Sequence, residues 1–97
     1  MSFVFMVFHY PAPEHRDDLI RSMTEMASHM SGQAGFVDAG PWWDERHPER
    51  VVGLSRWESR EAFLASGITV APDSDDVPEG EVRPRERFFL DRAHPGS

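Results

Sequence analysis

Apolar and polar residues follow two different periods along the chain, and these periods predict its elements. Residues 3–10 (FVFMVFHY) are β-branched or aromatic at almost every position and stop at Pro11, which is typical of a strand. Alternate residues of a strand face opposite sides of its sheet. The alternating sets are Phe3, Phe5, Val7 and His9 on one side, and Val4, Met6, Phe8 and Tyr10 on the other. Because both sets are largely apolar, both faces of this strand are predicted to be buried.

A helix is predicted to follow, beginning near Pro13 and ending at Gly32. Pro suits a first helical turn and Gly a helix end, and acidic residues after Pro13 suit the positive end of the helix dipole. Apolar residues then recur at helical spacing, at Leu19, Met23, Met26 and Met30. We interpret this stripe as adaptable core packing rather than as a cofactor-binding surface, because Met fills irregular gaps.

The second half of the chain predicts a hairpin, a short helix and a last strand. The hairpin strands are residues 36–44 and 50–57, and Gly40-Pro41 indicates that the first is an edge strand or carries a bulge, because Pro cannot donate to a central ladder. Ser59 can cap a helix over residues 60–66 that stops at Gly67. A polar, acidic loop (67–84), a strand (85–91) and a frayed tail (93–97) complete the chain.

The order strand, helix, strand, strand, helix, strand is that of the ferredoxin-like α+β fold. We expect one domain over residues 1–97, with a four-stranded antiparallel sheet and a core from residues 3–66 and 85–91. The most apolar strands, 3–10 and 51–57, are expected side by side at the centre and parallel to each other. The strands with Pro41 or with Arg85 and Arg87 are expected at the edges.

Two helices cover only one face of such a sheet, and the other apolar face of residues 3–10 then lacks a cover. Each large apolar side chain left in water forgoes about 1.5 to 3 kcal/mol. A chain of 97 residues without Cys has few other means of stabilisation. We therefore expect a homodimer that packs sheet against sheet, as a dimeric α+β barrel.

Charge and composition exclude several classes of function. A formal net charge of -7 without a basic cluster does not suit a nucleic-acid partner. No apolar stretch reaches the roughly 18 residues of a membrane span, and residues 3–8 lack the flanks of a signal peptide, so we expect a cytoplasmic protein without a membrane partner. Because Cys is absent and the His residues share no ligand spacing, no metal site is expected. All ten cationic side chains are Arg and Asn is absent, as in a GC-rich bacterial genome.

The segment 44–63 (DERHPERVVGLSRWESREAF) resembles the antibiotic biosynthesis monooxygenase family. The most specific part of the likeness is Trp57-Glu58-Ser59 with Glu61-Ala62-Phe63 behind it, and the turn at residues 34–36 adds to it. The likeness covers Phe3 to about Ser66. It implies a monooxygenase that oxidises an electron-rich aromatic molecule with dioxygen and no cofactor. Such chemistry needs a base, a partner for the developing oxyanion and a dry pocket.

Six residues are candidates for this chemistry. His9 is a candidate base because the pKa of imidazole lies near neutrality, although a structural role is an alternative. Arg56 either stabilises a phenolate or enolate or forms an ion pair with an acid across the dimer, and we favour the ion pair. Alternation places Arg56 and Trp57 on opposite strand faces, so both cannot line one pocket without a bulge.

The candidate substrate-binding residues are Trp57, Phe63, Trp43 and Gly53. Trp57 is also a candidate for core packing, and Gly53 beside so large a ring leaves room for a planar ligand. Trp42 and Trp43 face opposite ways, so at least one of them is expected to be packed. Gly53 and Phe63 stand where the quinone-forming members of the family carry Asn and Tyr.

These two replacements keep a second hypothesis open, namely a non-catalytic domain that binds a hydrophobic metabolite. Haem degradation by relatives of the same fold depends on an Asn in the first strand and a His in or after the second helix. This chain has no Asn, and residues 58–93 contain no His, so we set haem degradation aside. Isomerases and cyclases also use this fold and stay open as alternatives.

Overall fold

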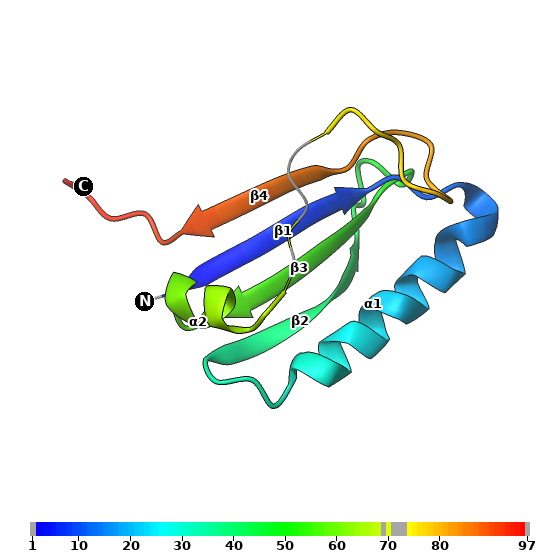
Figure 1. Cartoon of the computed structure of the whole chain (residues 1–97). Helices are drawn as coiled ribbons and strands as arrows, with labels where there is room; N and C mark the ends of the chain where they lie inside the picture. The colour runs from blue at the N-terminus through cyan, green and yellow to red at the C-terminus, as the bar shows by residue number, and fades with distance from the viewer. Residues whose placement is uncertain (1, 69, 71–73, 97) are drawn as a thin grey trace.

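The computed structural model shows a four-stranded antiparallel sheet with both helices on one of its faces (Figure 1). The structure describes residues 2–68, 70 and 74–96. The strands are β1 (Phe3–His9), β2 (Phe36–Trp43), β3 (Val51–Trp57) and β4 (Glu86–Asp91), in the order β2-β3-β1-β4. A 3-10 turn (Pro13–His15) leads into α1 (Arg16–Met30), and α2 (Arg60–Ala65) follows β3. The predicted fold class and order of elements are confirmed.

The two central strands are β1 and β3, as predicted, but they run antiparallel and not parallel. Phe3 lies opposite Trp57, and His9 lies opposite Val51. The connections explain the error. α1 carries the chain past β3 to β2, which runs parallel to β1, and the β2–β3 hairpin then reverses the direction.

The edge strands are those that the sequence predicts. β2 and β4 flank the sheet, and β2 also carries an irregularity in its pairing with β3. The register shifts between Phe36 and Asp38, and Gly40-Pro41 begins two residues after this shift. Pro41 lies on this edge strand. Its missing backbone N–H therefore does not break a hydrogen bond in the centre of the sheet.

The core lies under α2, at the end of the sheet where β1 begins and β3 ends. Ser59 caps α2 by accepting a hydrogen bond from the Ala62 N–H at 3.1 Å, which confirms the predicted cap. The helix then places Phe63 against Phe3 and Trp57, with ring centroids 5.3 and 5.8 Å apart. All three side chains are buried. Each contributes about 1.5 to 3 kcal/mol by leaving water.

The Met stripe of α1 is core only in part: Met30 packs against the core cluster, and the interpretation is wrong for Met26. No residue of α1 is buried, and Met26 is 56% exposed. Met23, Met26 and Met30 instead line a cavity between the helix and the sheet. The sheet presents small residues to this helix, including Ala39 and Gly53, so the helix meets a hollow and not a filled surface.

The face of the sheet opposite the helices is uncovered in the single chain. Val4, Met6 and Phe8 of β1 are only half-buried there, so the prediction that both faces of β1 are buried holds for the helix side alone. Trp42 and Trp43 are 60% and 58% exposed, which overturns the expectation that one of them is packed. Both lie on an edge strand, and Cζ of Arg16 lies 5.6 Å from the centroid of the Trp43 ring, within the range of a cation–π interaction.

Neither helix in the described residues has the length and apolar character needed to cross a membrane.

Candidate functional site

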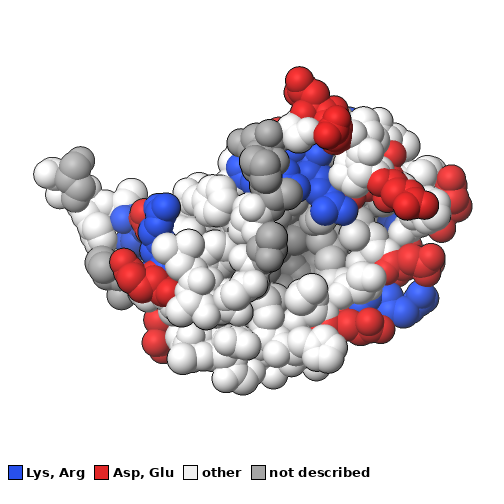
Figure 2. Space-filling view, in the orientation of Figure 1, with Lys and Arg blue, Asp and Glu red and all other residues white. Residues whose placement is uncertain are grey.

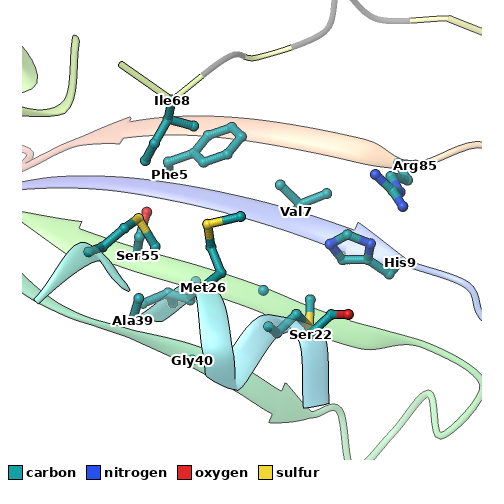
Figure 3. A pocket seen from close by; sticks show the side chains of 14 residues that line it. Phe5, Val7, His9, Ser22, Met26, Ala39, Gly40, Ser55, Ile68 and Arg85 are labelled. Atoms are coloured by element: carbon teal, nitrogen blue, oxygen red, sulfur yellow. The ribbon is translucent and has the colours of Figure 1, made fainter. Parts of the chain in front are cut away.

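A cavity of about 410 Å³ lies between α1 and the sheet. Its apolar lining includes Phe5, Val7, Met23, Met26, Met30 and Ile68, and its polar lining is His9, Ser22, Ser55 and Arg85. Figure 3 shows His9 and Arg85 together at one end, with Phe5 and Ile68 toward the other. Figure 2 views this side of the molecule, where uncharged surface predominates and Arg atoms gather at one border of the hollow. The cavity is therefore apolar along its length and polar at one end.

Gly53 keeps this cavity open. A Cβ atom at position 53 would lie 2.8 Å from Cε of Met23 and 3.4 Å from Nε2 of His9. The first distance would force the end of the Met23 side chain to move, and the second would place a methyl group in contact with the imidazole nitrogen. The structure thus agrees with the expectation that Gly53 leaves room, although the room adjoins His9 and not Trp57.

His9 is the last residue of β1, and its imidazole lines the cavity. The pKa of His9 is lowered from 6.5 to about 4, first by burial and then by the positive charge of Arg85, while Glu81 acts in the opposite direction. At pH 7 the imidazole is therefore neutral. Its Nδ1 is buried without a hydrogen-bond partner among the described residues and lies 3.7 Å from Oε2 of Glu81.

Glu81 and Arg85 are site residues that the sequence reasoning missed. The Glu81 carboxylate accepts a hydrogen bond from the Tyr10 N–H at 3.1 Å and another from Nε of Arg85 at 2.6 Å. Only 3% of the Glu81 side chain is exposed. The spacing of an acid and an Arg four residues apart is the one signal of this pair in the sequence, and it does not indicate that the pair meets His9.

The predicted loop over residues 67–84 forms no helix or strand in its described part, but the segment around Glu81 is hydrogen-bonded to the end of β1. Pro11 and Glu81 form an isolated β-bridge. The Ala12 N–H donates to the Gly80 carbonyl at 2.9 Å, and the Val82 N–H donates to the Tyr10 carbonyl at 2.8 Å. These bonds fasten residues 80–82 to the end of β1 and carry Glu81 to the cavity. Residues 69 and 71–73 of the predicted loop lie outside the described residues.

Trp57 and Phe63 do not line the cavity but lie in the core behind it. Trp57 is fully buried, and its indole N–H donates to Oγ of Ser55 at 3.1 Å. Phe63 packs on Phe5, whose ring lines the cavity, with centroids 5.1 Å apart. Trp57 and Phe63, which were predicted to contact a ligand, thus pack behind the residues that line the cavity. Trp43 is exposed on β2 and is not part of the cavity lining.

Arg56 faces the uncovered side of the sheet, so the structure does not bring it to His9. It forms a bidentate ion pair with Asp38, which lies opposite it on β2. The hydrogen bond from Arg56 lowers the pKa of the Asp38 carboxyl below its usual value. Side-chain alternation along β3 is the reason, because Gly53 and Ser55 take the cavity side. The favoured ion pair of Arg56 is thus present, but with an acid of the same chain, and the Arg that lines the cavity with His9 is Arg85.

No cluster of three or more His, Cys, Asp or Glu side chains suited to a metal ion occurs in the described part of the chain. At its polar end the cavity presents a neutral imidazole, a guanidinium and the Ser22 hydroxyl. An imidazole nitrogen can accept or donate a proton, and a guanidinium can stabilise an anion. This arrangement suits a small apolar molecule with one acidic or anionic group.

Comparison with known proteins supports the assignment of fold and family. The family model described as "Antibiotic biosynthesis monooxygenase" matches residues 1–67. Rv0793 of Mycobacterium tuberculosis has a similar structure, with a TM-score of 0.71, 17% identity and full coverage (100%) of both chains. A putative antibiotic biosynthesis monooxygenase of Nitrosomonas europaea has a TM-score of 0.68 and 16% identity, and covers 99% of this chain and 94% of its own.

A heme-degrading protein, Rv3592 of Mycobacterium tuberculosis, is also similar in structure. The TM-score is 0.57 at 20% identity, over 96% of this chain and 98% of that one. No curated protein matches the chain in sequence. At these identities the structural likenesses concern the fold alone.

Proposed function

This chain belongs to the antibiotic biosynthesis monooxygenase family, and on that premise we propose that it oxidises an electron-rich aromatic molecule with dioxygen in the cavity under α1. The observation that carries the proposal is an apolar cavity with a neutral imidazole and a guanidinium at one end. Its volume of about 410 Å³ is in the range of small-molecule sites. A tricyclic anthrone with an acidic methylene is a substrate of the fitting kind.

The reaction begins with removal of a proton from the substrate. Nε2 of His9 accepts the proton, and Arg85 stabilises the carbanion or enolate that remains. This anion transfers one electron to dioxygen, and the two radicals combine to form a C–O bond; the resulting peroxide anion takes the proton back from Nε2 of His9 and becomes a hydroperoxide. Loss of water from the hydroperoxide leaves a ketone, so that a CH₂ group and O₂ become a C=O group and H₂O. Most of the side chains around the anion are apolar, which reduces its contact with water.

Oxygen uptake with a hydroxyanthrone tests this proposal. The purified protein is expected to accelerate uptake above the spontaneous rate, and His9→Gln is expected to lose about 10²-fold to 10⁴-fold of that acceleration, the usual contribution of a general base. His29→Gln, an exposed His on α1, is the matched control and is expected to leave the rate unchanged. A His9→Gln protein with full activity would remove His9 from the mechanism.

A second function, binding of a hydrophobic metabolite without turnover, is favoured by the scarcity of polar groups in the cavity. Gly53, beside His9, has no side chain that could offer a polar group. This function predicts saturable binding of an anthrone or related aromatic without accelerated oxygen uptake. Calorimetric titration under nitrogen and oxygen uptake in air together decide between the two functions.

We also propose that two copies pair through the uncovered sheet face. Apolar side chains of three strands are available there, including Val4, Met6, Phe8, Trp42 and Leu90. Burial of this surface would stabilise a dimer, at about 25 cal/mol for each Å² removed from water. Such a face is apolar enough for an obligate interface.

A further inference from the structure

The carboxylate of Glu81 lies beside the imidazole of His9 and is held there by hydrogen bonds. The Tyr10 N–H binds one of its oxygens at 3.1 Å, and Nε of Arg85 binds the other at 2.6 Å. The residues on either side of Glu81 are hydrogen-bonded to Tyr10 and Ala12. Glu81 is therefore anchored through both its side chain and its backbone.

The imidazole of His9 has one nitrogen toward Glu81 and the other toward the cavity. Nδ1 is buried, has no hydrogen-bond partner among the described residues, and lies 3.7 Å from Oε2 of Glu81. Nε2 faces the space above Gly53, where a Cβ atom would lie only 3.4 Å away. A hydrogen bond to Oε2 needs about 2.7 to 3.2 Å, so a shift of the imidazole by less than about 1 Å would form it. Hydrogen bonds of catalytic groups commonly tighten in this way when a ligand binds.

Among the described residues, three charged groups act on His9. They are Glu81, Arg85 and Arg87, and Arg87 lies opposite Val7 on β4. The cavity-lining residues of α1 and β3 nearest this end, Ser22, Met23 and Gly53, carry no charge. Within the described part of the chain, Glu81 is thus the acid that acts on His9, because it raises the pKa of His9 while both Arg residues lower it.

We propose that Glu81 is a positioning residue, which receives the Nδ1–H of His9 and so presents the lone pair of Nε2 to the cavity. A carboxylate only accepts hydrogen bonds, and a neutral imidazole has one N–H, so a proton held on Nδ1 leaves Nε2 free to act as the base. As Nε2 takes up a proton, Glu81 also stabilises the imidazolium. The catalytic consequence rests on the proposed function, whereas the tautomer is a property of the protein alone.

Nitrogen-15 NMR of the His-labelled protein without substrate tests the tautomer. At pH 7 we expect the chemical shift of a protonated Nδ1 and of an unprotonated Nε2 in His9. Glu81→Gln is expected to increase the Nε2–H tautomer, whereas Glu79→Gln, an exposed acid in the same segment, leaves the spectrum unchanged. A wild-type His9 with its proton on Nε2 would overturn the proposal without recourse to any variant.

The pKa of His9 supplies a second readout that a purely structural role would not move. Loss of the Glu81 charge is expected to lower this pKa further, and Arg85→Gln is expected to raise it, because the two groups act in opposite directions. Glu81→Asp, which keeps the charge but draws it back, should fall between the wild type and Glu81→Gln. Equal His9 pKa values in wild type, Glu81→Gln and Arg85→Gln would refute the role.

The same variants separate this inference from the proposed function. In oxygen uptake with a hydroxyanthrone, the acidic limb of the pH–rate profile should move down in Glu81→Gln, and the maximum rate should fall. If the wild-type protein consumes no oxygen while His9 shows the expected tautomer, the proposed function fails and the role of Glu81 stands. If oxygen uptake depends on His9 but is unaffected by Glu81→Gln at every pH, the proposed function stands and the role of Glu81 fails.

Discussion

Acid should destabilise this protein through His9, and replacement of His9 should remove that sensitivity. The pKa of His9 is about 4 in the folded chain, against 6.5 for a free imidazole, chiefly because the side chain is buried. Between these two values the unfolded chain binds a proton that the folded chain does not. Stability therefore falls as the pH drops from 6.5 toward 4.

The size of the effect follows from the two pKa values. Each pH unit between them is worth about 1.4 kcal/mol, so the loss reaches about 2.5 kcal/mol by pH 4.5 and about 3 kcal/mol near the folded value. That is a large share of the roughly 5 to 15 kcal/mol that stabilises a typical domain. Titration of Asp38 and Asp44 does not interfere with this effect of His9 on stability. Their pKa values are lowered by Arg56 and Arg50, so they affect stability mainly below this pH range.

Urea unfolding of the wild type and of His9→Gln measures this effect, with the fluorescence of buried Trp57 as the signal and the protein concentration held constant. Between pH 7 and pH 4.5 the wild type is expected to lose about 2.5 kcal/mol more than the variant. Parallel profiles for the two proteins would refute the argument that burial keeps His9 neutral. If the wild type instead became more stable relative to the variant as the pH falls, the effect of Glu81 on the pKa of His9 would exceed the combined effect of burial and Arg85.

Three further predictions concern the cavity, the core and the uncovered face. Gly53→Ala is expected to weaken anthrone binding by about tenfold or more, because the added methyl group meets Met23 and His9 in the cavity, and to leave the unfolding free energy nearly unchanged. An unchanged affinity in a calorimetric titration would show that the ligand binds elsewhere. Phe63→Ala is expected to cost about 3 to 5 kcal/mol in urea unfolding. Leu64→Ala, its exposed neighbour, should stay within about 0.5 kcal/mol, and similar losses in both would contradict the assigned core. Leu90→Arg is expected to shift the dimer toward monomers, as measured by light scattering, whereas Leu64→Arg on the helix side is expected to leave the dimer intact. A wild-type protein that is monomeric at every concentration would rule out the pairing.

The local elements could be predicted because their signals are local. A period of two and a run of β-branched and aromatic residues indicate β1 and β3 whatever surrounds them. Ser59 and Gly67 bracket α2, and Pro41 restricts β2 to an edge, by backbone chemistry that needs no partner. The same alternation correctly separated Arg56 from the cavity side of β3.

The functional site could be predicted only in part, because its residues come from distant segments. His9 and Gly53 were recognisable from their places in central strands. Glu81 and Arg85 were not, since nothing in an acidic loop indicates that its backbone will pair with Pro11 and Ala12. The roles of Trp57 and Phe63 were likewise unsettled, because an aromatic residue that touches a ligand and one that supports the wall behind it have the same pattern in sequence.

The sequence by itself therefore determined the elements, their order and the family of this protein, since periodicity, caps and short motifs act over a few residues. Only the tertiary structure decided that the Met stripe of α1 lines a cavity, and that Glu81 and Arg85 meet His9 at its polar end. Those outcomes depend on the distance between helix and sheet and on where a long loop is fastened. Both are set by packing and hydrogen bonds between residues far apart in the chain.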